Sequence, residues 1–230
     1  MVLATGPTGS GKTTSLYAAL TIIDSTANNI MTIEDPVEYQ LEGVTQIPIN
    51  PRAEVTFASG LRSILRQDPD IIMVGEIRDR ETADIAIHAA LTGHLIFSSL
   101  HTNDAVRAIT RLMDIGIEPY LISGSVLAIL AQRLVRLNCP HCLISENPSD
   151  ETLMQYKIPL EKKKKFLKGK GCELCGFTGF TGRTGTFEIL VMNDSLRQMI
   201  DAKASAVTLQ EEAIRSGMRT MFYDGIEKAL

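Results

Sequence analysis

Four cysteines in two C-x-x-C pairs have a type and spacing that indicate chemistry. They stand in "LNCPHC" and "GCELCG" and are the only cysteines of the chain: Cys139, Cys142, Cys172 and Cys175. In a reducing cytosol such pairs bind a metal rather than form disulfides, and four thiolates leave a tetrahedral ion no open position. The gap between the pairs is longer than the roughly 15–20 residues common in zinc ribbons. We predict a structural Zn²⁺ site, with a dithiol redox centre and metal-free buried cysteines as alternatives.

A glycine-rich loop near the N-terminus, "GPTGSGKT", fits the pattern G-x-x-x-x-G-K-[ST] at every position. It follows an apolar stub and precedes an apolar-periodic segment, so it joins an expected strand to an expected helix. Main-chain amides and a helix N-terminus at such a loop hold phosphate. The predicted nucleotide-binding residues are Gly6, Pro7, Thr8, Gly9, Ser10, Gly11, Lys12 and Thr13. We expect Lys12 on the β- and γ-phosphates of ATP and Thr13 on Mg²⁺; the alternative is an ordinary glycine turn.

Three carboxylates and a histidine follow other expected strands. Glu34 and Asp35 end "MTIED", Glu76 follows "DIIMVG", and His101 follows "IFSSL". Ligands of open parallel sheets bind at the carboxyl ends of the strands, where these side chains fall. Helix capping is the alternative for the acids, and for Asp35 it is as well supported as a site role. A neutral imidazole at His101 could donate a hydrogen bond to a γ-phosphate oxygen and so sense hydrolysis.

Short unbroken apolar runs alternate with helical patterns over the first part of the chain. The expected strands are 1–4, 29–35, 69–76 and 94–100, and the expected helices are 13–24, 57–66, 80–91, 103–115 and 118–136. This alternation predicts an α/β fold with a parallel sheet. We expect three domains: an ATPase core over 1–136, a glycine-rich tetracysteine module over 137–183 and a C-terminal strand with short helices over 184–230.

The composition restricts the class of protein. The chain has 230 residues, of which 44% are hydrophobic, and a formal net charge of -4. It has no apolar run near the roughly 18 residues of a membrane span and no signal-peptide pattern, so we expect a cytosolic protein. The net negative charge argues against a nucleic-acid partner. The lysine run Lys162–Lys165 is interpreted as a solvated hairpin tip in preference to a contact with anionic lipid.

Four motifs occur in an order that resembles the bacterial ATPases of type II secretion and type IV pilus assembly. They are "GPTGSGKT", "TIEDPVEYQLEG", "LRQDPDIIMVGEIRD" and "TGHLIFSSLHTNDA". The resemblance implies a RecA-like P-loop NTPase core that forms a homo-hexamer and hydrolyses ATP with Mg²⁺. It also implies a cytoplasmic motor, peripheral to the inner membrane, that works on platform proteins there. The cysteine module favours a secretion or assembly motor over a retraction motor.

The resemblance also implies roles for single residues. Glu76 ends the Walker B motif and would organise Mg²⁺ and water, Glu34 and Asp35 lie in the Asp box, and His101 lies in the His box. Glu34 is the favoured activator of water, although sequence does not separate its role from that of Glu76. Arginines in these segments serve subunit junctions near the phosphates: Arg62, Arg66, Arg78 and Arg183. A helix face paired with acids is an equally supported interpretation of Arg62 and Arg66.

Full-length members of this family carry a further N-terminal domain that closes over the nucleotide. We therefore expect this chain to be a piece that binds nucleotide but hydrolyses it slowly. A nucleotide-gated assembly scaffold with little turnover is the main rival interpretation. A nucleic-acid translocase on the same core is disfavoured by the acidic composition and by the lack of tryptophan for base stacking.

Overall fold

The computed structural model of the chain describes residues 1–156, 158 and 166–229. By internal contacts the chain divides into two compact units. The first unit comprises Met1–Arg133 and Phe187–Met221, and the second comprises Leu134–Thr186 and Phe222–Leu230. The lysine run Lys162–Lys165 lies outside the described residues.

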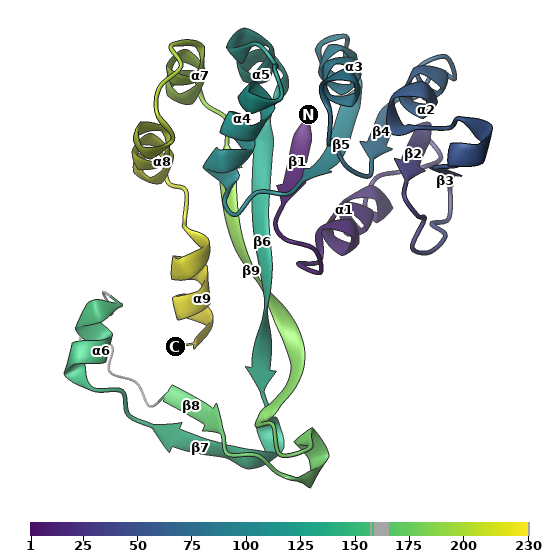
Figure 1. Ribbon diagram of the computed structural model, residues 1–230. Helices are drawn as coiled ribbons and strands as arrows, with labels where there is room; N and C mark the ends of the chain where they lie inside the picture. Colours follow the sequence, from purple (N-terminus) through teal and green to yellow (C-terminus); the bar gives the residue numbers. More distant parts are fainter. Residues whose placement is uncertain (157, 159–165, 230) are drawn as a thin grey trace. The chain divides into compact units, whose positions relative to one another are not determined.

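The first unit is built on a seven-stranded sheet in the order β3-β2-β4-β5-β1-β6-β9 (Figure 1). The strands are β1 (Val2–Thr5), β2 (Ile30–Glu34), β3 (Val44–Pro48), β4 (Ile71–Val74), β5 (Leu95–Leu100), β6 (Ala128–Asn138) and β9 (Phe180–Val191). All pairings from β3 through β6 are parallel, which confirms the predicted α/β class. Strands β6 and β9 extend along the chain into the second unit.

Successive residues of each inner strand point to opposite faces of the sheet, and each face carries its own apolar cluster. Leu3 and Ile72 join one cluster, whereas their neighbours Ala4 and Met73 join the other. The first cluster is covered by α2 (Phe57–Ile64), α3 (Arg80–Leu91), α4 (Ala105–Asp114), α5 (Pro119–Ser125), α7 (Asp194–Asp201) and α8 (Ala206–Arg215). Helix α1 (Lys12–Thr21) covers the second cluster. Burial on both faces explains why the strand sequences are unbroken apolar runs.

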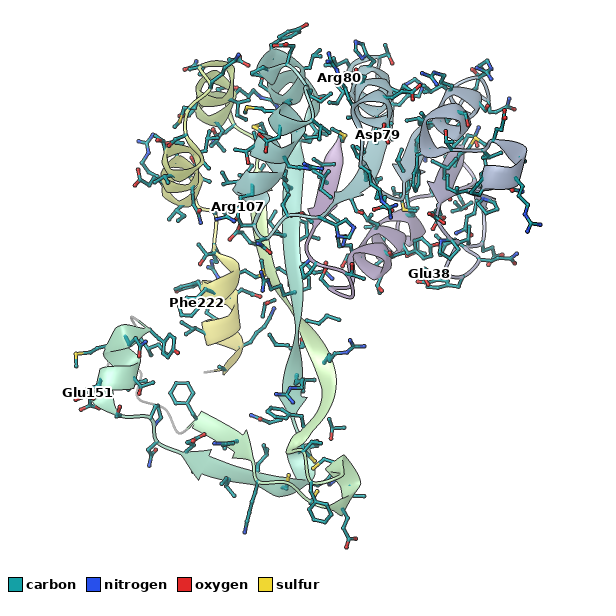
Figure 2. All side chains as sticks on the ribbon, in the orientation of Figure 1. Glu38, Asp79, Arg80, Arg107, Glu151 and Phe222 are labelled. Atoms are coloured by element: carbon teal, nitrogen blue, oxygen red, sulfur yellow. The ribbon has the colours of Figure 1, made fainter. Side chains whose placement is uncertain are left out.

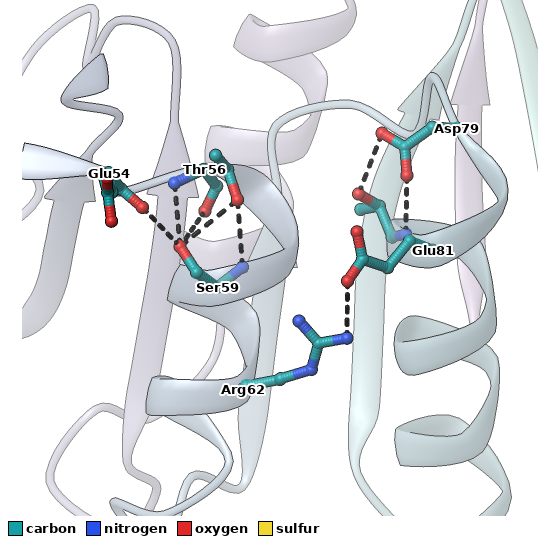
Figure 3. Close-up of polar contacts among 7 residues, drawn as sticks. Glu54, Thr56, Ser59, Arg62, Asp79 and Glu81 are labelled. Atoms are coloured by element: carbon teal, nitrogen blue, oxygen red, sulfur yellow. Dashed lines mark hydrogen bonds and ion pairs between the residues drawn. The ribbon is translucent and has the colours of Figure 1, made fainter. Parts of the chain in front are cut away.

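Side-chain caps set where several helices begin. Thr56 and Ser59 form a reciprocal capping box at the start of α2, just after the short 3-10 helix η1 (Pro51–Ala53), as Figure 3 shows. Asp79 accepts a bond of 2.8 Å from the amide of Thr82 at the start of α3. Gly93, with φ +111°, follows α3 and stops it, because a left-handed residue ends a helix.

The predicted helix over 118–136 is wrong after its first turns. Helix α5 ends at Ser125 and β6 begins at Ala128, which pairs with Val2 of β1. A hydrogen-bonding partner far away in sequence overrides the local helical pattern here, because β1 would otherwise lack a neighbour on that side. Strand β3 escaped prediction because "VTQIP" is partly exposed and has no continuous apolar run.

Besides the ends of β6 and β9, the described part of the second unit contains short elements. They are the 3-10 helices η2 (Pro140–Cys142) and η4 (Glu173–Cys175), strands β7 (Leu143–Glu146) and β8 (Phe166–Gly169), helix α6 (Asp150–Gln155) and most of α9 (Met221–Ala229). Strands β7 and β8 pair antiparallel. The rings of Tyr156 and Phe222, the latter labelled in Figure 2, lie 5.9 Å apart. In the described residues, no helix combines the length and apolar character that crossing a bilayer requires.

Candidate functional site

The phosphate loop runs from the end of β1 to the start of α1 in a conformation that needs glycine. Gly9 and Gly11 have φ values of +76° and +90°. Gly6 has φ +150°, and a Cβ there would lie only 2.4 Å from the carbonyl oxygen of Gln132. The glycines of the motif therefore let the main chain turn tightly and pass close to β6.

Lys12 is 9% exposed and lies in the first turn of α1. Its ammonium donates to the carbonyl oxygens of Gly6 at 2.9 Å and Pro7 at 3.3 Å. Burial lowers the pKa of Lys12, and the nearby carboxylate of Glu76 opposes that shift. The structure thus brings the lysine of the loop and the acid after β4 into one electrostatic neighbourhood, with the half-buried Thr13 next to Lys12.

Gln132 of β6 supports the phosphate loop through two hydrogen bonds, and no pattern in the sequence indicates this. Its amide nitrogen donates to the carbonyl oxygen of Ser10 at 2.8 Å, and its amide oxygen accepts from the hydroxyl of Ser15 at 2.8 Å. Among the described residues, the buried hydroxyl of Ser10 has no hydrogen-bond partner. Because buried hydroxyls are nearly always satisfied, this orphan fits a site that closes around an oxygen-rich ligand.

Glu76 is the acid whose charge acts on the lysine of the loop. Its side chain is 12% exposed, forms an ion pair with Arg78, and lies 3.3 Å from Nε2 of His101. The Glu76 carboxylate raises the pKa of Arg78. The amide of the preceding Gly75 donates a hydrogen bond of 2.8 Å to the carbonyl oxygen of Ile33. This bond fixes the backbone just before Glu76. The structure therefore gathers Lys12, Glu76, Arg78 and His101 at one edge of the sheet.

Glu34 lies at the end of β2 and is only 2% exposed. Its Oε2 accepts from the hydroxyl of Tyr17, and its Oε1 accepts from Thr32 Oγ1 at 2.5 Å and Gln46 Nε2 at 3.1 Å. Burial and the bond to Glu34 raise the pKa of Tyr17. The neighbouring Asp35 is exposed, and its charge contributes to raising the pKa of Arg78. Asp35 therefore acts electrostatically at the sheet edge that carries Glu76 and Arg78.

Sequence reasoning missed Tyr17 and Gln46 as partners of Glu34. Tyr17 occupies an apolar position in the helical pattern of α1, and Gln46 lies in β3, which was not predicted. A tyrosine and a glutamine near an acid carry no spacing signal, because the contacts form only when β2, β3 and α1 pack together.

The remaining arginines do not join this group. Arg62 on α2 forms an ion pair of 2.6 Å with Glu81 on α3 (Figure 3), and Arg66 reaches the hydroxyl of Ser63 at 3.4 Å. Among the described residues, neither arginine bonds to Lys12, Glu34 or Glu76. The contact of Arg62 with Glu81 therefore favours the interpretation of Arg62 as part of a helix face paired with acids. Arg183 is exposed on β9 in the second unit.

In the second unit the four cysteines converge. Their sulfur atoms all lie within 4.8 Å of one another. The Sγ–Sγ distances are 4.0 Å for Cys139–Cys172, 4.0 Å for Cys142–Cys175 and 3.8 Å for Cys172–Cys175. Tetrahedral zinc with Zn–S bonds of about 2.3 Å puts its sulfur ligands roughly 3.8 Å apart, so the arrangement fits that ion.

Main-chain amides around the cysteine cluster favour thiolates. The amides of Cys172 and Gly179 donate to the sulfur of Cys175 at 3.2 Å and 3.3 Å, and the amide of Gly171 donates to Cys142 at 3.3 Å. The Cys172 amide is the largest cause that lowers the pKa of Cys175 to about 6, whereas burial raises the pKa of Cys142 to about 11. A cation bound among the four sulfurs would stabilise the thiolate of Cys142 and so oppose the rise in its pKa.

A sequence model of the family described as "Type II/IV secretion system protein" matches residues 1–230. Type II secretion system protein E of Klebsiella pneumoniae is 52% identical over 230 residues, which cover 100% of this chain and 46% of that protein. Type IV pilus assembly ATPase PilB of Thermus thermophilus is 51% identical over 230 residues, covering 99% of this chain and 26% of that protein. The chain thus spans less than half the length of these two relatives.

A similar fold occurs in a crystal structure of the pilus retraction motor PilT with bound ADP. The TM-score is 0.64 at 29% sequence identity, and the match covers 97% of this chain and 59% of that chain.

Proposed function

This chain belongs to the type II/IV secretion system protein family, and from that premise we propose that it is the catalytic part of an ATP-hydrolysing motor. The motor would power type II secretion or type IV pilus assembly. One observation carries the proposal: Glu76, two residues after the end of β4, shares a sheet edge with the phosphate loop and exerts its charge on Lys12. A phosphate-binding lysine with an enclosed carboxylate opposite it suits hydrolysis of a bound triphosphate.

The residues of the loop fit a nucleotide with Mg²⁺. The glycine turns and the N-terminus of α1 offer amides to phosphate, and the Ser10 hydroxyl lacks any other partner in the described chain. Lys12, now bonded to loop carbonyls, would turn to the β- and γ-phosphates. Thr13 would hold the metal ion, and Glu76 would orient that ion and its water. When bound, Mg²⁺ supplies charge neutralisation at the phosphates.

The neighbouring groups would divide the remaining work. Glu34 would accept the proton of the attacking water, as a fixed carboxylate within the site. His101 contacts Glu76 and would report the loss of the γ-phosphate. Arg78 and the nearby Asp35 are assigned to nucleotide binding at the exposed side of the site. For Arg62, Arg66 and Arg183 a role at subunit junctions stays a proposal.

Replacing Glu76 by Gln tests the proposal, because Gln keeps the size of the side chain and removes its charge. We expect Glu76→Gln to retain ATP binding and lose at least about a hundredfold in the hydrolysis rate measured in a single turnover. Glu42→Gln is the matched control, since this acid is exposed in the chain before β3. A wild-type chain that binds ATP without any hydrolysis would instead favour the nucleotide-gated scaffold.

The second unit would bind one structural Zn²⁺ through Cys139, Cys142, Cys172 and Cys175. The convergence of the four sulfurs and the amides aimed at them support this assignment over a redox centre. For the longer protein we propose a homo-hexamer that works in the cytoplasm, peripheral to the bacterial inner membrane, on secretion or pilus platform proteins. The names of the relatives in Klebsiella pneumoniae and Thermus thermophilus support the link to secretion or pilus assembly. The net negative charge argues against a nucleic-acid partner.

A further inference from the structure

A buried tyrosine hydroxyl touches the carboxylate of Glu34. Tyr17 is 0% exposed, and its ring packs edge-on against Tyr39 with 4.8 Å between the ring centroids. Its hydroxyl donates to Oε2 of Glu34. Because Tyr17 lies in the core cluster between α1 and the sheet, the ring has no freedom to turn this hydroxyl elsewhere.

The partners of the hydroxyl decide which way its proton points. A tyrosine hydroxyl has one proton to donate and two acceptor positions. The acceptor positions face the amide of Glu38 at 3.3 Å and Nε2 of Gln46 at 3.2 Å, and Nε2 shares its two protons among this hydroxyl, Glu34 and the carbonyl oxygen of Tyr39. The proton is therefore directed at Oε2 of Glu34, which accepts it.

The two oxygens of Glu34 are not equivalent. Oε1 accepts two bonds, from Thr32 and Gln46. Among the described residues, Oε2 accepts from Tyr17 alone, so it keeps one acceptor position. The donors fix the orientation of the carboxylate and leave a single place at which it can receive another proton donor.

Helix α1 connects this clamp to the phosphate loop. Lys12 stands in its first turn, and Tyr17 follows about 7 Å further along the axis at the helical rise of about 1.5 Å per residue. Leu16 and Leu20 hold the helix on the sheet. One rigid element therefore sets both where the phosphates bind and where the Glu34 carboxylate lies.

We propose that Tyr17 is a positioning residue for ATP hydrolysis, which holds Oε2 of Glu34 where the attacking water is deprotonated. The inference rests on the proposed function and assigns to α1 the task of keeping the acid in register with the triphosphate. The one proton of the Tyr17 hydroxyl is donated to Glu34, so in this proposal the effect of Tyr17 on hydrolysis passes through that carboxylate.

A double-mutant cycle on the chain tests this, measured by single-turnover hydrolysis with protein in excess over ATP, which registers slow rates. Tyr17→Phe removes only the hydroxyl. We expect the rate to fall about ten- to a hundredfold, as loss of a bond to a charged group would give, while ATP affinity stays within about twofold. In a Glu34→Gln background the same change should have an effect below about twofold, because the carboxylate that Tyr17 positions is gone.

Tyr39→Phe is the matched control, since it removes a hydroxyl from the exposed partner ring and should leave the rate unchanged. If Tyr17→Phe does not fold, Gln46→Met serves instead, because it removes a second donor to Glu34. Its reduction of the hydrolysis rate should likewise vanish in the Glu34→Gln background. An unchanged rate in Tyr17→Phe, an equal loss in the Glu34→Gln background, or a parallel loss of ATP affinity would overturn the inference. A wild-type chain without hydrolysis would overturn the proposed function as well, whereas an active Glu34→Gln beside an inactive Glu76→Gln would overturn the inference and the role of Glu34 but leave the ATP-hydrolysing motor in place.

Discussion

The two sites of this chain are held together by different means. The phosphate loop and its acids stand on strands whose two faces carry apolar clusters, from Leu3 on one face to Phe97 on the other. In the described chain, the second unit contributes no residue to either cluster, and its four cysteines meet among short elements. The first site therefore depends on burial of apolar surface, and the second, as we propose, on a metal ion. Each should fail under a treatment that the other survives.

Removal of the metal should have the largest effect. We expect a chelator, or Cys172→Ser, to unfold the second unit locally, because binding free energies of about 10–16 kcal/mol in zinc-finger peptides exceed what a small unit without a core can supply. Metal analysis should find about one zinc per chain before treatment. Hydrogen exchange should then show lost protection in β7 and β8.

The first unit provides the control for that experiment. Amides of β1 and β4, and ATP binding, should be unchanged after the metal is removed, since their surroundings are apolar side chains of the first unit. If purified protein contains no metal and β7 and β8 are still protected from exchange, the second unit does not depend on a metal ion.

Truncation of a core side chain should destabilise the first unit and leave the second unchanged. Ile72 of β4 is 0% exposed, and Ile72→Ala should lower the free energy of unfolding of the first unit by about 2–5 kcal/mol through lost burial and a cavity. Denaturant unfolding measures the change, and the zinc content should stay the same. Ile214→Ala, at a half-exposed position of α8, is the control and should cost below about 0.5 kcal/mol. If Ile72→Ala also lost zinc, the two regions would have to unfold as one cooperative unit, which would contradict the comparison.

The same contrast explains what could be predicted from sequence. The glycines and Lys12 of the phosphate loop, the acids at strand ends and the spacing of the cysteines are local patterns, and the structure brings each of these groups together. The residues that support them are not local. Ser15 and Gln132 lie 117 residues apart, and β6 itself was predicted as helix, so nothing near Gln132 in sequence announces its contact with the loop.

Loss of the support from Gln132 should weaken nucleotide binding. Gln132→Ala frees the carbonyl of Ser10 and the hydroxyl of Ser15 in a buried place, which should cost about 1–3 kcal/mol and lower ATP affinity roughly tenfold or more. Titration calorimetry measures the affinity, and the zinc content should not change. Gln67→Ala is the matched control on an exposed turn. Equal affinities for the wild type and Gln132→Ala would mean that the glycine turns shape the loop without help from β6.

The surface ion pair between Arg62 and Glu81 should have the smallest effect and sharpens what holds the first unit together. Both side chains are about half exposed, so Arg62→Ala should lower the free energy of unfolding by only about 0.2–1 kcal/mol. Glu81→Ala should cost a similar amount, and the double variant little more, because both single changes remove the same pair.

The hydrolysis rate of these two variants separates the two interpretations of Arg62. If the arginine only pairs with its neighbour on α3, both variants should hydrolyse ATP at the wild-type rate. A loss in Arg62→Ala that is absent from Glu81→Ala would instead assign the guanidinium to a subunit junction, since freeing it from Glu81 keeps it available there. Either way the change in stability stays far below that of Ile72→Ala, because charges on an exposed helix face gain little over water whereas a buried side chain cannot be replaced by solvent.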